Sequence, residues 1–139
     1  MCLSYITKRY KPNEETVVGY QIKLKKIIKG KEKFTGRFYS AKLHTFSRFT
    51  KCEPKTCREK TAYSQSQYYK PGFHIYSNVE GALELYKEGG NANMGMKLVI
   101  CKVEGKGIIC RGSQSFEVHV CEKMKILKVY KRPPRRKAN

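Results

Sequence analysis

The 139-residue chain contains no aspartate and no tryptophan, and all eleven of its acidic residues are glutamate. It also lacks any apolar run near the ~20 residues that a membrane-spanning helix needs. The opening MCLSYITKRY has no apolar core of the kind found in signal peptides, so we expect a cytoplasmic protein. Without export, the six cysteines (Cys2, Cys52, Cys57, Cys101, Cys110 and Cys121) are expected to remain reduced.

These absences also weaken the case for an enzyme. A cysteine nucleophile needs a nearby base and a third group that orients it, and the sequence has no local signature of such an arrangement. Glu80, Glu84 and Glu88 recur at helical spacing, which is typical of a solvated helix face rather than of catalytic carboxylates. The segment GKGIICRG lacks the spacing of a phosphate-binding loop. We therefore expect no catalytic activity and no cofactor.

Positive charge is what the chain has in excess. Thirty lysine and arginine residues against eleven glutamates give a formal net charge of +19. The excess is uneven, because residues 1–70 contain 17 basic and five acidic residues, whereas residues 71–130 contain eight and six. The tail 131–139 adds five basic residues. A field of this sign attracts phosphate-rich partners, nucleic acid or anionic nucleotides among them.

Hydrophobic periodicity predicts one α+β domain over residues 1–130, followed by a disordered basic tail, 131–139. We expect a mostly antiparallel sheet of five or six strands with one main helix, about residues 78–88, packed on it. In TVVGYQIKLKKII, Tyr20, Ile22 and Leu24 alternate with Gln21, Lys23 and Lys25, which predicts a half-buried strand whose second face is basic and exposed. The turn KGKEK then leads to a strand FTGRFYS.

The stretch PGFHIYSNVEGALELYKEGG predicts a short strand followed by the helix. Phe73 and Ile75 share one face of the strand, and His74 and Tyr76 share the other. Ser77 and Glu80 match a capping box, and Gly89–Gly90 matches a helix end. KLVICKVEGKGIICRG and FEVHVCEKMKILKVY supply two or three further strands, whereas residues 41–70 read as a long loop or short irregular elements.

Zinc is one alternative use of the polar residues. His44, Cys52 and Cys57 form a His-x7-Cys-x4-Cys series that His74 or Cys2 could complete. Structural zinc sites usually combine closely spaced ligand pairs, and the sequence offers no second pair. We therefore predict no metal site.

The interleaving of basic and aromatic residues in the first half of the chain predicts a ligand surface, because cations bind phosphate and flat rings stack on bases. His74 precedes a helix N-terminus and is either a ligand contact or a hydrogen-bonded structural residue. The candidate phosphate- or ligand-binding residues are Arg37, Tyr39, Lys42, Arg48, Lys51, Arg58, Lys60, Tyr68, Tyr69, His74, Tyr76 and Arg111.

Several short motifs resemble small proteins encoded by phages and prophages. They are the start MCLSYITKRYKP, the GY at 19–20, GFHIYSNVEGA at 72–82, LVICKVEGKGII and KMKIL. The turn-helix motif is also similar to phage proteins that sequester the signal nucleotides of Thoeris defence, although the basic segment 41–70 departs from that pattern. The resemblance implies a role in the host cytoplasm against host defence, and no activity that carries over.

The sequence is compatible with three functions. The first is a non-enzymatic protein that binds nucleic acid, or sequesters a signalling nucleotide, through residues 23–76. The second is a protein–protein inhibitor of a host defence or CRISPR-type complex, and the third is an ADP-ribosyl-transfer-like enzyme, suggested only by a histidine near a strand end. Oligomeric state is left open.

The tail generates a direct test. Residues 131–139 contain five basic residues and two prolines, so we expect them to add affinity for polyanions and no folding free energy. Truncation after Tyr130 should leave the thermal midpoint unchanged and weaken binding to a 20-nucleotide strand. A midpoint lowered by several degrees would show instead that the tail docks on the domain.

Overall fold

The computed structural model describes residues 5–36, 43–44, 46, 49–51, 60–62, 67–69, 72–89, 97–113, 115–130, 132 and 134. One helix, α1 (Val79–Gly89), accompanies ten strands in this part of the chain. The strands are β1 (Tyr5–Arg9), β2 (Thr16–Ile28), β3 (Lys31–Gly36), β4 (Leu43–His44), β5 (Thr50–Lys51), β6 (Lys60–Ala62), β7 (Gln67–Tyr69), β8 (Phe73–Tyr76), β9 (Lys97–Ser113) and β10 (Glu117–Tyr130).

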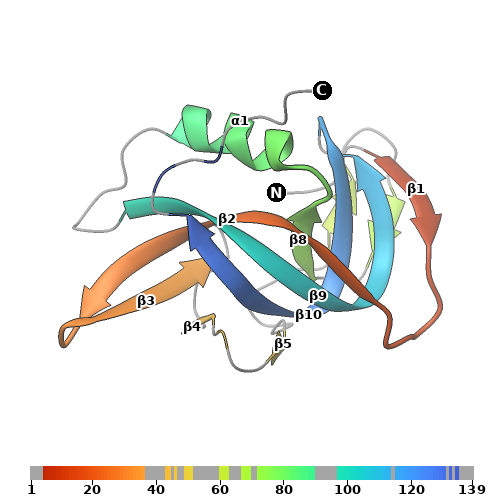
Figure 1. Ribbon diagram of the computed structural model, residues 1–139. Coiled ribbons are helices and arrows are strands. Elements are labelled where there is room, and N and C mark those ends of the chain that lie inside the picture. Colours follow the sequence, from red (N-terminus) through yellow and green to blue (C-terminus); the bar gives the residue numbers. More distant parts are fainter. Residues whose placement is uncertain are drawn as a thin grey trace.

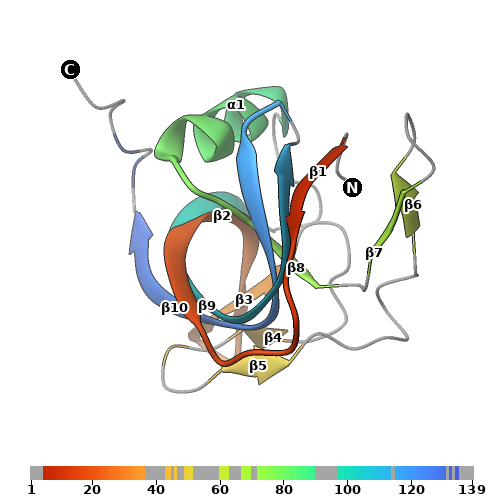
Figure 2. The same ribbon diagram turned by 90° about the vertical axis from the view of Figure 1, so that its right-hand side faces the viewer.

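The main sheet closes on itself. Its strand order is β1-β9-β10-β8-β2-β3-β4, with β5 on β10, and every pairing is antiparallel. A further ladder joins β9 to β2, so β9, β10, β8 and β2 form a ring (Figure 2). Three long strands, β2, β9 and β10, supply most of this small barrel, while β6 and β7 pair separately.

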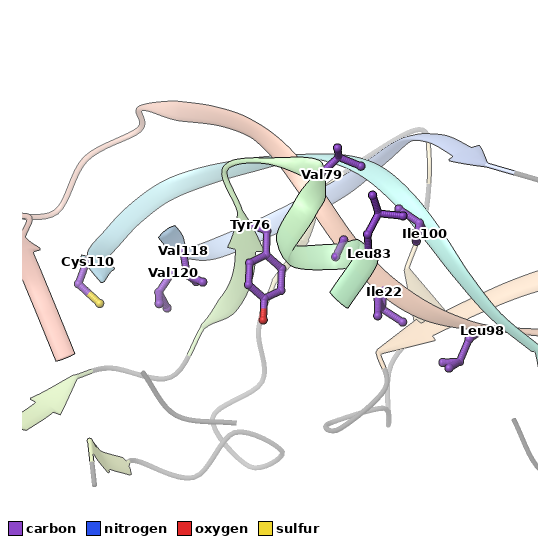
Figure 3. Close-up of a cluster of buried hydrophobic side chains, with 10 residues drawn as sticks. Ile22, Tyr76, Val79, Leu83, Leu98, Ile100, Cys110, Val118 and Val120 are labelled. Carbon is purple, nitrogen blue, oxygen red and sulfur yellow. The ribbon is translucent and has the colours of Figure 1, made fainter. Parts of the chain in front are cut away.

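Both faces of β9 are buried from Leu98 to Cys101, which explains the continuous apolar run LVIC at the start of this strand. One face of β2, β9 and β8 points into the barrel. We call the apolar group there the barrel cluster: Phe34, Ile75, Val99, Cys101, Val103, Ile108, Cys121, Met124 and Ile126. The other face carries the helix-side cluster: Ile22, Tyr76, Val79, Ala82, Leu83, Leu98, Ile100, Cys110, Val118 and Val120 (Figure 3).

Helix α1 lies outside the barrel (Figure 1) and contributes Val79, Ala82 and Leu83 to the helix-side cluster. These residues recur at helical spacing, so they lie on one face of the helix. Ser77 precedes the helix, but its hydroxyl bonds Glu117 and His119 on β10, and its amide donates to the carbonyl of Glu117. The helix start is therefore tied to the sheet through Ser77, whereas the sequence predicted a link to Glu80.

The predicted strand alternation is confirmed for β8 and for one face of β2. Ile75 and Phe73 belong with the barrel cluster, whereas Tyr76 belongs with the helix-side cluster. Tyr20, Ile22 and Leu24 likewise pack on the helix side.

Six strands of the main sheet have four or more residues, which agrees with the predicted five or six, and the two-residue strands β4 and β5 join its edges. Two expectations are wrong in detail. Gln21 and Lys23 do not form an exposed basic face, because the barrel closes over this side of β2 and Lys23 is 0% exposed. The turn after β2 consists of Lys29 and Gly30, both with positive φ as a type I′ hairpin requires, so β3 begins at Lys31 rather than Phe34.

The structure is a mostly antiparallel sheet with one short helix, which agrees in outline with the predicted α+β class. No helix in the described part of the chain is long and apolar enough to span a membrane. Residues 37–42, 52–59, 90–96 and nearly all of the tail fall outside the described residues.

The ring closes at a seam between β2 and β8 where the two strands approach closely. Their ladder contains a single residue pair among the described residues, Tyr20 opposite Tyr76. A Cβ atom on Gly19 would lie 2.6 Å from Cγ2 of Ile75, and still closer to the carbonyl oxygen of Tyr76. Only glycine therefore fits at position 19 without moving the backbone of β8.

Gly19→Ala should consequently destabilise the fold by about 1–3 kcal/mol, because the added methyl group overpacks the seam. The matched control is Gly30→Asn, which stands in open space and tolerates a left-handed backbone. Denaturant unfolding compares the two variants with the wild type. Equal stability of Gly19→Ala and the wild type would show that the seam opens enough to accept a side chain.

Candidate functional site

The outer face of β9 and β10 carries a row of lysines. Lys106 stands opposite Lys123, Glu104 opposite Lys125, and Lys102 opposite Lys128. Residues directly opposite in an antiparallel ladder share a face, so five lysines and one glutamate gather on one surface. We call Lys102, Lys106, Lys123, Lys125 and Lys128 the lysine strip.

Two ion pairs among the described residues neutralise part of this charge. Lys125 Nζ lies 3.4 Å from Glu104 Oε1, and Lys106 Nζ lies 3.4 Å from Glu14 Oε2. Both pairs are partly exposed, where ion pairs contribute at most about 1 kcal/mol. The strip therefore keeps a net positive charge at every pH at which lysine is protonated.

Aromatic rings lie among these ammonium groups. Lys125 Nζ is 4.8 Å and Lys106 Nζ is 5.6 Å from the ring centre of Phe49, and Lys128 Nζ is 4.8 Å from that of Tyr130. Burial raises the pKa of Tyr130, and the charge and hydrogen bond of the neighbouring Tyr20 raise it further, so the Tyr130 phenol stays neutral. Cations beside flat rings are the elements that a nucleic-acid surface combines.

Strand β2 borders the strip on its other side. Thr16, Val18 and Tyr20 stand opposite Lys106, Glu104 and Lys102. Val18 is 47% exposed, although it is apolar and lies in the middle of a ladder. The surface of the lysine strip thus continues onto β2, to the exposed Val18 and to Tyr20.

One of the predicted ligand residues lies on a strand that pairs with β10, since the backbone of Lys51 on β5 stands opposite Lys123. Lys60, Tyr68 and Tyr69 lie on the separate two-stranded sheet of β6 and β7, where Lys60 stands opposite Tyr69 and Tyr68 opposite Thr61. Arg37, Tyr39, Lys42, Arg48 and Arg58 lie outside the described residues.

The other predicted residues have different surroundings. Tyr76 is buried and packs edge-to-face on Phe116 at 6.5 Å, so its ring offers no free face for a base. Arg111 stands opposite His119 on β10 and Lys8 on β1, away from the strip. His74 is half-buried, and desolvation lowers its pKa to about 4, so it is an uncharged imidazole at neutral pH.

Sequence reasoning missed the lysine strip because it averaged charge along the chain. Residues 71–130 carry only two more basic than acidic residues, since three glutamates on the helix segment offset the lysines of the strands. The available signal was the period-two spacing of lysine in CKVEGK and EKMK, which places these charges on one strand face.

A buried polar chain lies on the inner side of β2. Lys23 Nζ donates to Gln21 Oε1, and Gln21 Nε2 donates to the carbonyl oxygen of His74 at 2.9 Å. Desolvation lowers the pKa of Lys23 from 10.5 to about 7, and the nearby Cys101 thiol opposes this shift. These two hydrogen bonds span the seam between β2 and β8, where ladder hydrogen bonds are few.

Ser77, Glu117 and His119 form a second polar group, near the helix start. Ser77 Oγ donates to Glu117 Oε1 at 2.7 Å and lies 3.1 Å from His119 Nδ1. In a serine–histidine–carboxylate triad the carboxylate bonds the far ring nitrogen, whereas here both groups bond the serine. The geometry is that of an anchor for the helix start.

The described residues contain no group of three or more histidine, cysteine or glutamate side chains placed to hold a metal ion. Cys2, Cys52 and Cys57 of the predicted series lie outside them. Cys101, Cys110 and Cys121 are buried free thiols, as the sequence predicts, and burial raises the pKa of the first two to about 11 and of Cys121 to about 12.

Comparison with protein-family models, with curated proteins and with solved structures finds no match to this chain.

The lowered pKa of Lys23 predicts how the free energy of unfolding depends on pH. Its pKa is lower in the folded chain than in the unfolded chain, so between about pH 7 and pH 10.5 the unfolded state binds more protons and stability rises with pH. The slope is at most about 1.4 kcal/mol per pH unit. Above pH 9 the buried thiols act in the opposite direction, because they ionise more readily when unfolded.

Unfolding free energies measured between pH 7 and pH 9 should therefore rise in the wild type and stay nearly flat in Lys23→Met. Lys97→Met, at an exposed position of β9, is the control and should keep the wild-type slope. A flat wild-type profile would mean that Lys23 is solvated in solution.

Proposed function

We propose that this protein binds nucleic acid, without catalysing a reaction, through the lysine strip on the outer face of β9 and β10. The supporting observation is the pair of directly opposed lysine–lysine positions, Lys106 with Lys123 and Lys102 with Lys128. Like charges in this register destabilise a sheet. A polyanion laid along the strip converts that repulsion into binding free energy by releasing its condensed counterions.

The length of the strip favours a polymer over a single small nucleotide. Lys102 and Lys106 are four residues apart on one strand, a distance of about 13 Å at the rise of an extended chain. Phe49, Tyr20 and Tyr130 lie along the same surface. Ring stacking adds roughly 1–3 kcal/mol per base and needs no particular sequence.

A setting in phage–host conflict is part of this proposal, and the sequence resemblance alone supports it. Binding in the host cytoplasm would then protect or mask nucleic acid from a defence complex. No observation in the structure specifically favours the protein–protein inhibitor or the ADP-ribosyl-transfer-like enzyme.

The test is the salt dependence of affinity for a 20-nucleotide strand. A protein that contacts Z phosphates of a single strand should show a log–log slope of about −0.7Z. Lys102→Gln/Lys128→Gln should reduce the magnitude of that slope by about one unit or more, weaken binding about tenfold, and leave stability unchanged or higher because a like-charge pair is removed.

Lys87→Gln is the matched control, since Lys87 is exposed on α1, away from the strip. It should retain wild-type affinity. The proposal is overturned if Lys102→Gln/Lys128→Gln binds the strand as tightly as Lys87→Gln does. It is also overturned if the wild type binds a cyclic nucleotide tightly and without salt dependence but binds the strand weakly.

A further inference from the structure

The hairpin of β2 and β3 extends past the end of the barrel. The ladder between β2 and β9 ends at Lys25 opposite Lys97, whereas β2 and β3 continue to pair as far as Ile28 opposite Lys31. Residues 26–33 thus form a two-stranded ribbon, visible as the projecting arm in Figure 1. Phe34 anchors its base, since it is buried in the barrel cluster and packs edge-to-face on Phe46 at 5.8 Å.

The two faces of this ribbon differ in charge. Lys26 stands opposite Lys33, and Ile28 stands opposite Lys31, so one face carries three lysines and no acid. The other face carries Ile27 opposite Glu32, and Glu32 is already paired with Lys25 at 2.9 Å. Lys29 adds a further positive charge at the turn.

The tip also exposes apolar surface. Ile27 is 67% and Ile28 is 39% exposed, next to a tight two-residue turn. Repulsion between the opposed lysines and exposure of the isoleucines each cost the free ribbon some free energy. Both features are offset if the ribbon enters a partner that presents phosphates on its walls and apolar groups inside.

We propose that residues 26–33 form a ribbon that enters the major groove of duplex nucleic acid, an inference that rests on the proposed function. The major groove is about 12 Å wide and admits a two-stranded β-ribbon. The lysines of the ribbon contact the phosphates along the groove walls, and Ile28, which shares their face, contacts the C5-methyl groups of thymine on its floor.

An anionic lipid surface is the competing occupant. It also attracts lysines, but two isoleucines contribute only about 1.5–3 kcal/mol each when fully buried. That amount is small, since even a whole myristoyl chain gives marginal membrane binding. The concentration of positive charge over the eight residues 26–33 favours nucleic acid as the partner.

The experiment compares a 20-base-pair duplex with a 20-nucleotide single strand. Lys26→Gln/Lys31→Gln/Lys33→Gln should weaken duplex binding by about tenfold or more and reduce the magnitude of its salt slope by about three units. Its affinity for the single strand should fall much less. Lys87→Gln serves as the control, and thermal midpoints check that every variant is folded.

A second variant tests the tip without changing charge. Ile27→Ser/Ile28→Ser should weaken binding of a thymine-rich duplex more than binding of a duplex in which uracil replaces thymine and the methyl groups are absent. Because both side chains are exposed, the fold should persist.

The outcomes are distinguishable. Unchanged duplex affinity in the ribbon variants, with lost affinity in Lys102→Gln/Lys128→Gln, overturns the ribbon inference and leaves the proposed function standing. No binding of either nucleic acid by the wild type overturns both. The ribbon is assigned to a membrane instead if the wild type binds phosphatidylserine vesicles more tightly than duplex and Ile27→Ser/Ile28→Ser loses this vesicle binding.

Discussion

The seam between β2 and β8 is the constraint on which the rest of the structure depends. With one ladder pair at this point, the ring is held together by side-chain chemistry as well as by backbone hydrogen bonds. Gly19 allows the two strands to touch, and Gln21 replaces a missing ladder bond by donating to the carbonyl of His74. Lys23 orients the Gln21 amide, which gives a physical reason for placing an ammonium group in an apolar barrel.

Closure of the barrel divides the remaining surface into two parts. The inner faces of β2, β9 and β10 are filled by the barrel cluster and have no access to a large partner. Outside, helix α1 covers one half of the same strands through Val79, Ala82 and Leu83. Among the described residues, the other half of the outer face carries the lysine strip, and the hairpin arm carries a second group of lysines.

The sequence predicted local structure better than it predicted which face meets solvent. The strand of residues 73–76, the helix that follows and the long strand of residues 16–28 are recovered nearly to their ends, because periodicity and glycine signals are local. Alternation alone, however, cannot say whether the second face of a strand is exposed. Lys23 and Gln21 were assigned to solvent since their charge and polarity suggested it, and ring closure, which depends on contacts between residues distant in sequence, reversed the assignment.

The position of the lysine strip follows from the same register. Along one face of β9 the residues are Leu98, Ile100, Lys102, Glu104 and Lys106, and the first two stand opposite Leu24 and Ile22 under the helix. The change from apolar to charged residues between Ile100 and Lys102 therefore marks the edge of the helix cover. The helix cover and the strand charge thus change at the same point of the register, and under the proposed function the part of the sheet that α1 leaves uncovered is where nucleic acid binds.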